Sequence, residues 1–187
     1  MIINEKGLAR QIKRAYKRAG YTIRELEGDL CIYTADWFIR VPWRNLPKKA
    51  LGAIAEHVGY DFAGATALHI AKDLEPQILM DSVADEDVLG WVQAEEGCFA
   101  KFVPVTIGMR TVLQGNHGIC FGINSELRDL LEEDAQQLSM CTIWDGCKAA
   151  WNGDGECLIV NAYRGALDPS ATESEKAIWN ALERIKF

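Results

Sequence analysis

The first sixty residues carry a helical pattern of apolar positions, then three strand patterns, then a second helical pattern. Asn4 can cap the first helix, whose apolar stripe ends at Gly20. That stripe consists of Leu8, Ile12, Ala15, Tyr16 and Ala19. The expected strands are Tyr21–Leu26, Leu30–Thr34 and Trp37–Trp43, and the second helix runs from about Pro47 to Gly59. Residues 1–61 are therefore predicted to form an α-β-β-β-α unit.

Residues 68–187, after a small-residue connection at Phe62–Ala67, show more strand patterns than helical ones. Strands are expected at Leu68–Lys72, Gln77–Val83, Cys98–Ile107, Arg110–Leu113, Ile119–Ile123, Ser139–Trp144 and Cys157–Tyr163. Helices are expected at Asp85–Val92 (an acidic turn or short helix), from Asn124 or Ser125 through Leu131, and after the capping box of Thr172 and Glu175. Because strands and helices do not alternate regularly, we predict an α+β fold. Its second domain, 68–187, is expected to be a mixed, mainly antiparallel sheet with packed helices.

Composition fits a globular protein and excludes several other classes. The chain has 187 residues, of which 49% are hydrophobic and 25% charged, which excludes collagen, coiled coils and disordered linkers. No stretch approaches the roughly 18 apolar residues of a membrane span, and early charges leave no apolar signal-peptide region. Six cysteines without a Cys-x-x-Cys pair indicate reduced thiols. We expect a cytoplasmic protein without membrane contact, and the oligomeric state stays open.

Charge is distributed unevenly along the chain. Residues 1–49 hold eleven Lys/Arg against five Asp/Glu, a net charge of +6. The remaining residues hold 9 Lys/Arg against 22 Asp/Glu, a net charge of −13. Such asymmetry points to binding partners rather than to a fold.

The basic first part suggests one class of partner. The first helix and the third strand carry basic residues that could neutralise the phosphates of a nucleic acid. These residues are Lys6, Arg10, Lys13, Arg14, Lys17, Arg40 and Arg44. The same face could also be solvated, or could dock onto the chain's own acidic part.

The acidic second part suggests a different partner. Two clusters of carboxylates could imitate a phosphate backbone and occupy a basic groove on a larger protein. They are Asp85, Glu86 and Asp87, and Glu132, Glu133 and Asp134. The second cluster is expected late in a helix, where carboxylates oppose the helix dipole. Trp91 and Trp151, in polar or turn-like surroundings, are the tryptophans expected to be exposed at an interface.

No motif in the sequence names a reaction. Zinc-like Cys/His spacing, a Gly-x-Ser-x-Gly elbow and nucleotide-binding glycine loops are all absent from the sequence, so we assign no catalytic residue, metal or cofactor. The leading hypothesis is a non-enzymatic binding protein or inhibitor, such as a nucleic-acid-mimicking, anti-CRISPR-like antagonist from a phage or mobile element. The alternatives are a nucleic-acid-binding accessory protein and an enzyme whose site is scattered in sequence.

Overall fold

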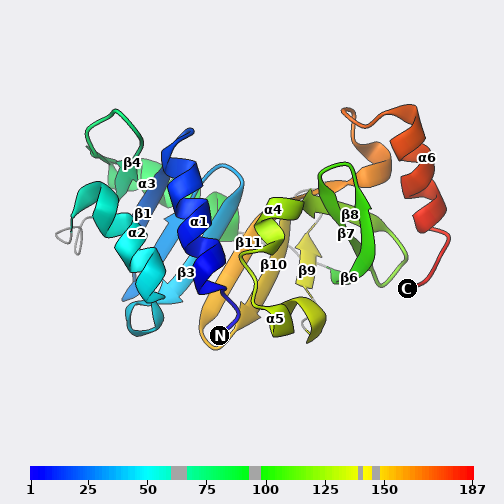
Figure 1. The fold of residues 1–187 in the computed structure, drawn as a ribbon, viewed down its shortest axis with the longest axis horizontal. Coiled ribbons are helices and arrows are strands. Elements are labelled where there is room, and N and C mark those ends of the chain that lie inside the picture. Colours follow the sequence, from blue (N-terminus) through cyan, green and yellow to red (C-terminus); the bar gives the residue numbers. More distant parts are fainter. Residues whose placement is uncertain (60–66, 93–97, 139–140, 145–147) are drawn as a thin grey trace.

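The computed structural model describes residues 1–59, 67–92, 98–138, 141–144 and 148–187, and it confirms the α+β fold (Figure 1). The helices in this part of the chain are α1 (Glu5–Tyr16), α2 (Lys48–Val58), α3 (Asp81–Val92), α4 (Ser125–Arg128), α5 (Glu133–Leu138) and α6 (Glu173–Leu182), with short 3-10 helices η1 (Trp43–Asn45) and η2 (Gly165–Leu167). The strands are β1 (Tyr21–Leu26), β2 (Asp29–Tyr33), β3 (Trp37–Pro42), β4 (Leu68–Ile70), β5 (Gln77–Ile78), β6 (Cys98–Ile107), β7 (Arg110–Gly115), β8 (Cys120–Asn124), β9 (Cys141–Trp144), β10 (Lys148–Gly153) and β11 (Glu156–Arg164).

The first part of the chain follows the order predicted from its apolar pattern. Helices α1 and α2 lie over one face of the sheet formed by β1, β2 and β3, and α3 lies behind it (Figure 1). Alternation along β3 explains both contacts. Trp37 and Ile39 enter the core that contains Leu8 and Ile54, whereas Phe38 packs with α3.

The sheet continues from the first part of the chain into the second. All strand pairings among the described residues are antiparallel, and β3 pairs with β2 and with β11. Strands β11, β10, β9, β6, β7 and β8 pair in a closed circle, because β8 returns to β11. The second part of the sheet is thus organised around β11.

The two predicted domains share one core across this sheet. Leu8 and Ile54 belong to the same buried cluster as Leu130 and Leu158. The predicted connection, Phe62–Ala67, lies outside the described residues except for Ala67. The division into domains 1–61 and 68–187 stays a prediction. The two parts are in extensive contact, because residues of both belong to one buried cluster.

The structure differs from the sequence expectations at several places: strand β10 (Lys148–Gly153) was not expected, and α1 ends at Tyr16, before Ala19. The strand expected over Gln77–Val83 stops at Ile78, since α3 starts at Asp81. The helix expected from Asn124 or Ser125 through Leu131 is only the short α4, which ends at Arg128. Leu131 forms an isolated β-bridge with Ile3 instead of another helical turn. The turn expected from Trp151 is only the two-residue turn of a hairpin, where Asp154 and Gly155 have φ of 54° and 78°.

No helix in the described ranges is long and apolar enough to cross a membrane.

The approach of α1 to the second part of the chain depends on Gly7. A Cβ at this buried residue would collide with the backbone carbonyl of Asp129. We expect Gly7→Ala to lower the free energy of unfolding by about 3 kcal/mol, as overpacking against backbone does. The measurement is urea unfolding followed by circular dichroism.

Gly52 in α2 provides the matched control, because nothing lies within 4 Å of the position that a Cβ would occupy there. Gly52→Ala should raise the free energy of unfolding by about 0.5–1 kcal/mol through helix propensity. Equal stability of the Gly7→Ala and wild-type proteins would contradict the close approach.

Candidate functional site: charged surfaces and the acidic–apolar segment

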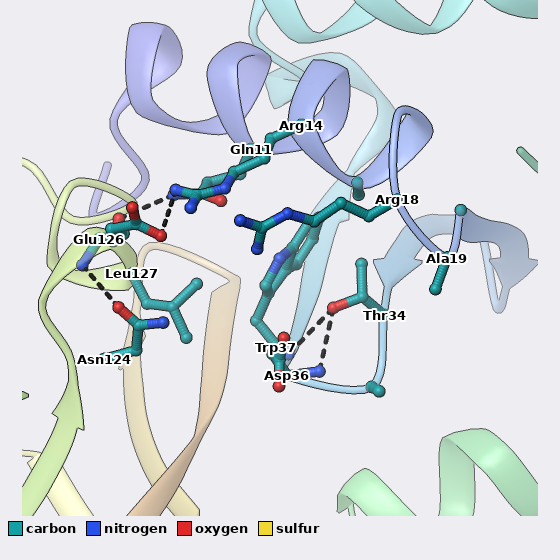
Figure 2. A pocket seen from close by; sticks show the side chains of 13 residues that line it. Gln11, Arg14, Arg18, Ala19, Thr34, Asp36, Trp37, Asn124, Glu126 and Leu127 are labelled. Atoms are coloured by element: carbon teal, nitrogen blue, oxygen red, sulfur yellow. Dashed lines mark hydrogen bonds and ion pairs between the residues drawn. The ribbon is translucent and has the colours of Figure 1, made fainter. Parts of the chain in front are cut away.

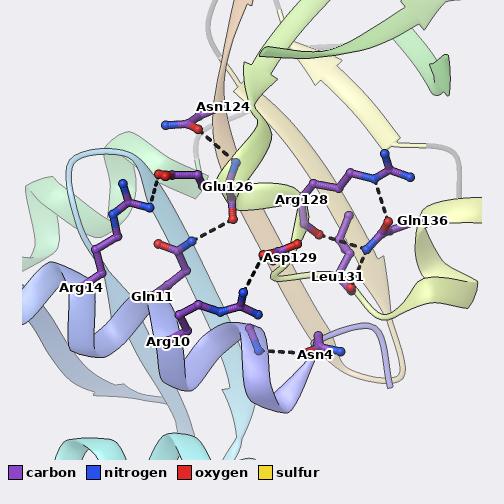
Figure 3. Close-up of polar contacts among 11 residues, drawn as sticks. Asn4, Arg10, Gln11, Arg14, Asn124, Glu126, Arg128, Asp129, Leu131 and Gln136 are labelled. Carbon is purple, nitrogen blue, oxygen red and sulfur yellow. Dashed lines mark hydrogen bonds and ion pairs between the residues drawn. The ribbon is translucent and has the colours of Figure 1, made fainter. Parts of the chain in front are cut away.

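Helix α1 places its basic face against the acidic second part of the chain (Figure 3). Arg14 forms an ion pair with Glu126, and Arg10 pairs with Asp129 at 3.1 Å. The buried side chain of Gln11 donates a hydrogen bond to the backbone carbonyl of Glu126 at 2.8 Å. The two oppositely charged parts of the sequence therefore contact each other along α1 and α4.

Other residues predicted to bind nucleic acid also have internal partners. The ammonium of Lys13 lies 2.7 Å from a carboxylate oxygen of Glu56 on α2. Arg40 pairs with Asp29 at 2.7 Å and with Glu27 at 3.1 Å. Among the contacts of the described residues, no ion pair involves Lys6, Lys17 or Arg44, and all three are exposed. Pairing lowers the positive potential that a phosphate backbone would meet at the paired residues.

The second acidic cluster lies at the start of a helix. Glu133 and Asp134 occupy the first turn of α5 and are exposed. The expectation that they oppose the helix dipole is wrong, because the third helix ends early and carboxylates in a first turn are favourable. Glu132 accepts a hydrogen bond from the side chain of Asn4 at 3.2 Å, so it also helps to hold the start of the chain.

The first acidic cluster lies on α3, where one carboxylate forms an internal ion pair and the other two face solvent. Asp85 forms an ion pair with Arg24, whose side chain is only 11% exposed. Glu86 and Asp87 are exposed on the same helix. Arg24 is not among the residues that the sequence patterns single out. Its position in β1, next to the buried Ile23, was the feature of the sequence that could have indicated a partly buried arginine.

Trp91 and Trp151 are buried, so the expectation that they are exposed is wrong. Trp91 is 9% exposed and stacks on Phe38, with their ring centroids 6.4 Å apart. Trp151 is 1% exposed and stacks on Phe102 at 5.8 Å. Their polar sequence neighbours belong to the outer face of α3 and to a hairpin turn, while the rings point inward. A role for these two residues in partner contact stays a prediction.

Residues 72–89, which we call the acidic–apolar segment, combine exposed apolar side chains with carboxylates. Ile78 is 76% exposed, Met80 73% and Leu74 60%. The segment holds six Asp/Glu against one Lys, a net charge of −5. Large apolar side chains that remain exposed together in one segment are typical of interaction surfaces.

Two elements of the acidic–apolar segment, β5 and α3, are attached to the sheet. Its strand β5 pairs with β4 and is the last strand in the sheet order of the described residues. Its helix α3 buries Ala84 and Val88 against the sheet, at the spacing of one helical face with Trp91. The exposed side chains are thus presented from a folded support.

The described residues include several thiols and carboxylates whose surroundings can be compared with those of reactive groups. No group of three or more His, Cys, Asp or Glu in these residues is placed to hold a metal ion. Burial raises the pKa of Cys31 to about 12 and the pKa values of Cys120 and Cys157 to about 11. A raised pKa suppresses the thiolate, which is the nucleophilic form.

Comparisons with protein-family models, with curated proteins and with solved structures find no match to this chain.

The pairing of Asp85 with Arg24 predicts a structural effect at one acidic position only. Asp85→Asn removes the carboxylate that faces the mostly buried guanidinium, and we expect the free energy of unfolding to fall by about 1–2 kcal/mol. Glu86→Gln, the adjacent exposed position, should leave it unchanged within about 0.5 kcal/mol. Urea unfolding of both variants checks this, and equal effects would contradict a special role for Asp85.

The raised thiol pKa values predict slow chemical labelling. At pH 8 the native chain should react with iodoacetamide at Cys31, Cys120 and Cys157 at least about a hundredfold more slowly than the urea-unfolded chain. The rates should rise towards pH 10, because the thiolate fraction grows as pH approaches the raised pKa. Mass spectrometry of the labelled peptides gives each rate. Fast labelling of native Cys31 at pH 8 would overturn the expectation.

Proposed function

We propose that this protein is a non-enzymatic binding protein that docks onto a larger protein through the acidic–apolar segment, residues 72–89. The observation that carries this proposal is the exposure of Leu74, Ile78 and Met80 beside a net charge of −5. A complementary partner surface would offer an apolar pocket with Lys and Arg around its rim. The proposed docking residues include Glu86 and Asp87, two of the six carboxylates in the sequence-based prediction of an acidic contact surface.

Internal ion pairs favour this proposal over nucleic-acid binding through α1. Arg10, Lys13 and Arg14 already face carboxylates of the same chain. A nucleic acid would have to compete with these carboxylates for each guanidinium or ammonium group. The acidic–apolar segment needs no such rearrangement, since Glu86 and Asp87 are exposed and lie on the outside of α3.

Two finer parts of the hypothesis rest on the sequence. The role as a counter-defence antagonist from a phage or mobile element is proposed from the acidic charge and from the absence of catalytic motifs in the sequence. A cytoplasmic location is proposed with it, and the free thiols of Cys31, Cys98, Cys120 and Cys157 support this location.

The test is affinity capture from a lysate of the source organism, followed by affinity measurement with the purified captured protein. Wild-type protein should bind it in a salt-dependent manner. Two variants should each weaken binding at least about tenfold, since they remove apolar anchors or reverse charge. They are Ile78→Ser with Met80→Ser, and Glu86→Lys with Asp87→Lys.

The second acidic cluster supplies the control. Glu133→Lys with Asp134→Lys makes the same change of charge on exposed residues of α5, and it should leave the affinity unchanged. Circular dichroism confirms that each variant is folded. Capture without dependence on residues 78, 80, 86 and 87 would overturn the proposal, as would loss of binding only in the control variant.

A further inference from the structure

A pocket of about 130 Å³ lies where the two parts of the chain meet (Figure 2). Its walls come from the end of α1, from the turn between β2 and β3, and from the junction of β8 with α4. Arg14 and Arg18 line it from α1 and the turn that follows, and Asp36 and Trp37 line it from the β2–β3 turn and β3. Asn124 and Leu127 close the opposite side.

Two charged residues of the pocket lining, Arg18 and Asp36, are exposed and have no charged partner in the part of the chain that the structure describes. The guanidinium of Arg14 is matched by Glu126. Among the contacts of the described residues, neither Arg18 nor Asp36 has an ion pair or a side-chain hydrogen bond. Figure 2 shows Arg18 reaching into the pocket from the turn after α1, with Asp36 and Trp37 entering it from the turn between β2 and β3. The two groups line the same space, yet they do not pair with each other.

The walls of the pocket are held in place without a ligand. The hydroxyl of Thr34 accepts hydrogen bonds from the backbone N–H groups of Asp36 and Trp37, at 3.1 and 3.3 Å. Asn161 in β11 donates to the carbonyl of Asp36 at 3.0 Å and to that of Ala35 at 2.7 Å. A ligand would therefore meet a largely preformed turn, which reduces the entropy lost on binding.

We propose that this pocket binds a small zwitterion of the α-amino-acid type. Its carboxylate contacts the guanidinium of Arg18, and its ammonium contacts the carboxylate of Asp36. A guanidinium recognises a carboxylate through charge-assisted hydrogen bonds, and an ammonium supplies three donors to a carboxylate. Trp37, which is 3% exposed, also lines the pocket, and its burial in the core anchors the turn that carries Asp36.

The balance of charge favours a zwitterion over a simple anion. Arg14 and Arg18 are offset by Asp36 and Glu126, so the lining carries no net positive charge. A phosphate dianion would gain from Arg18 but would face two carboxylates, whereas a zwitterion satisfies both unpaired groups.

A second cavity of about 180 Å³ gives room for a side chain. It shares Asp36, Asn124 and Leu127 with the first pocket and extends to Met109 and Tyr163. The guanidinium of Arg110 lies 4.9 Å from the centre of the Tyr163 ring, and the residue is 42% exposed, so a ligand side chain can contact the remaining surface of the ring. The site is separate from the acidic–apolar segment, and its test does not depend on the proposed docking function.

The experiment is isothermal titration calorimetry at low ionic strength with glycine, L-serine, L-leucine and L-phenylalanine as probes. Acetate, methylammonium and inorganic phosphate are the comparison probes, because each carries only one kind of charge. At least one amino acid should bind and raise the melting temperature of the chain. The single-charge probes should bind at least about tenfold more weakly.

Variants test the two contacts separately. Arg18→Gln and Asp36→Asn should each weaken the binding of the amino acid at least about tenfold, the loss of one charge-assisted contact. Lys17→Gln, an exposed cation at the end of α1 outside the pocket lining, is the matched control and should bind like wild type. Thermal unfolding confirms that each variant is folded.

Three results would overturn the proposal. The first is no heat of binding and no thermal shift with any amino acid at concentrations on the order of 10 mM, well above the Kd of even a weak specific site. The second is phosphate or acetate binding as tightly as the amino acids, which would define an anion site. The third is binding that survives both Arg18→Gln and Asp36→Asn.

Discussion

The pairing of β3 with β11 is the interaction on which the rest of this structure depends. Trp37 lies opposite Val160, and Arg40 lies opposite Cys157, so two segments about 120 residues apart in sequence share one register. Strand β11 also pairs with β8 and β10, which closes the circle of strands in the second part of the chain. A slip of one residue in this pairing would reverse the faces of β3 and move Trp37 out of the core.

This pairing also decides where the charges of the chain meet. With β3 against β11, α1 comes to lie beside α4, and Arg10 and Arg14 reach Asp129 and Glu126. These exposed pairs add little stability by themselves. Their effect is on recognition, because they remove part of the basic surface and part of the acidic surface from contact with other molecules. The net charge of −7 therefore conceals an internal pairing, and the exposed carboxylates of Glu86 and Asp87 on α3 are left to face solvent.

Much of the local structure could be predicted from the sequence, because it depends on neighbours along the chain. The stripe from Leu8 to Ala19 and the capping box at Thr172 specify α1 and α6 through local spacing and capping alone. The expectation for Trp151 is wrong because the glycine-rich residues after it suggest a longer turn than the hairpin needs. The expectation for Trp91 is wrong because its acidic neighbours hide its alignment with Ala84 and Val88 on one helical face.

The candidate surfaces were less predictable, because they depend on contacts between distant segments. The sequence shows the cluster of Asp85, Glu86 and Asp87. It does not show that Asp85 alone forms an ion pair, because its partner Arg24 lies some sixty residues away. The apolar pattern around Ile78 and Met80 predicts a longer strand, although Pro76 and the flanking acidic residues favour a short, interrupted one. No local pattern could place Arg18 and Asn124 in the lining of one pocket, since contacts between distant segments, such as the β3–β11 pairing and the ion pairs of α1, bring them together.

Strand β3 also relates the two candidate surfaces to each other. Trp37 lines the pocket, and the next residue, Phe38, packs against Trp91 of α3 on the other face of the sheet. Hydrogen bonds on both edges, to β2 and to β11, hold this strand in register. A ligand over Trp37 and a partner on α3 would therefore act on opposite faces of one firmly held strand. This arrangement keeps the pocket charges away from the carboxylates of α3, so that each surface can be altered by substitution while the other stays intact.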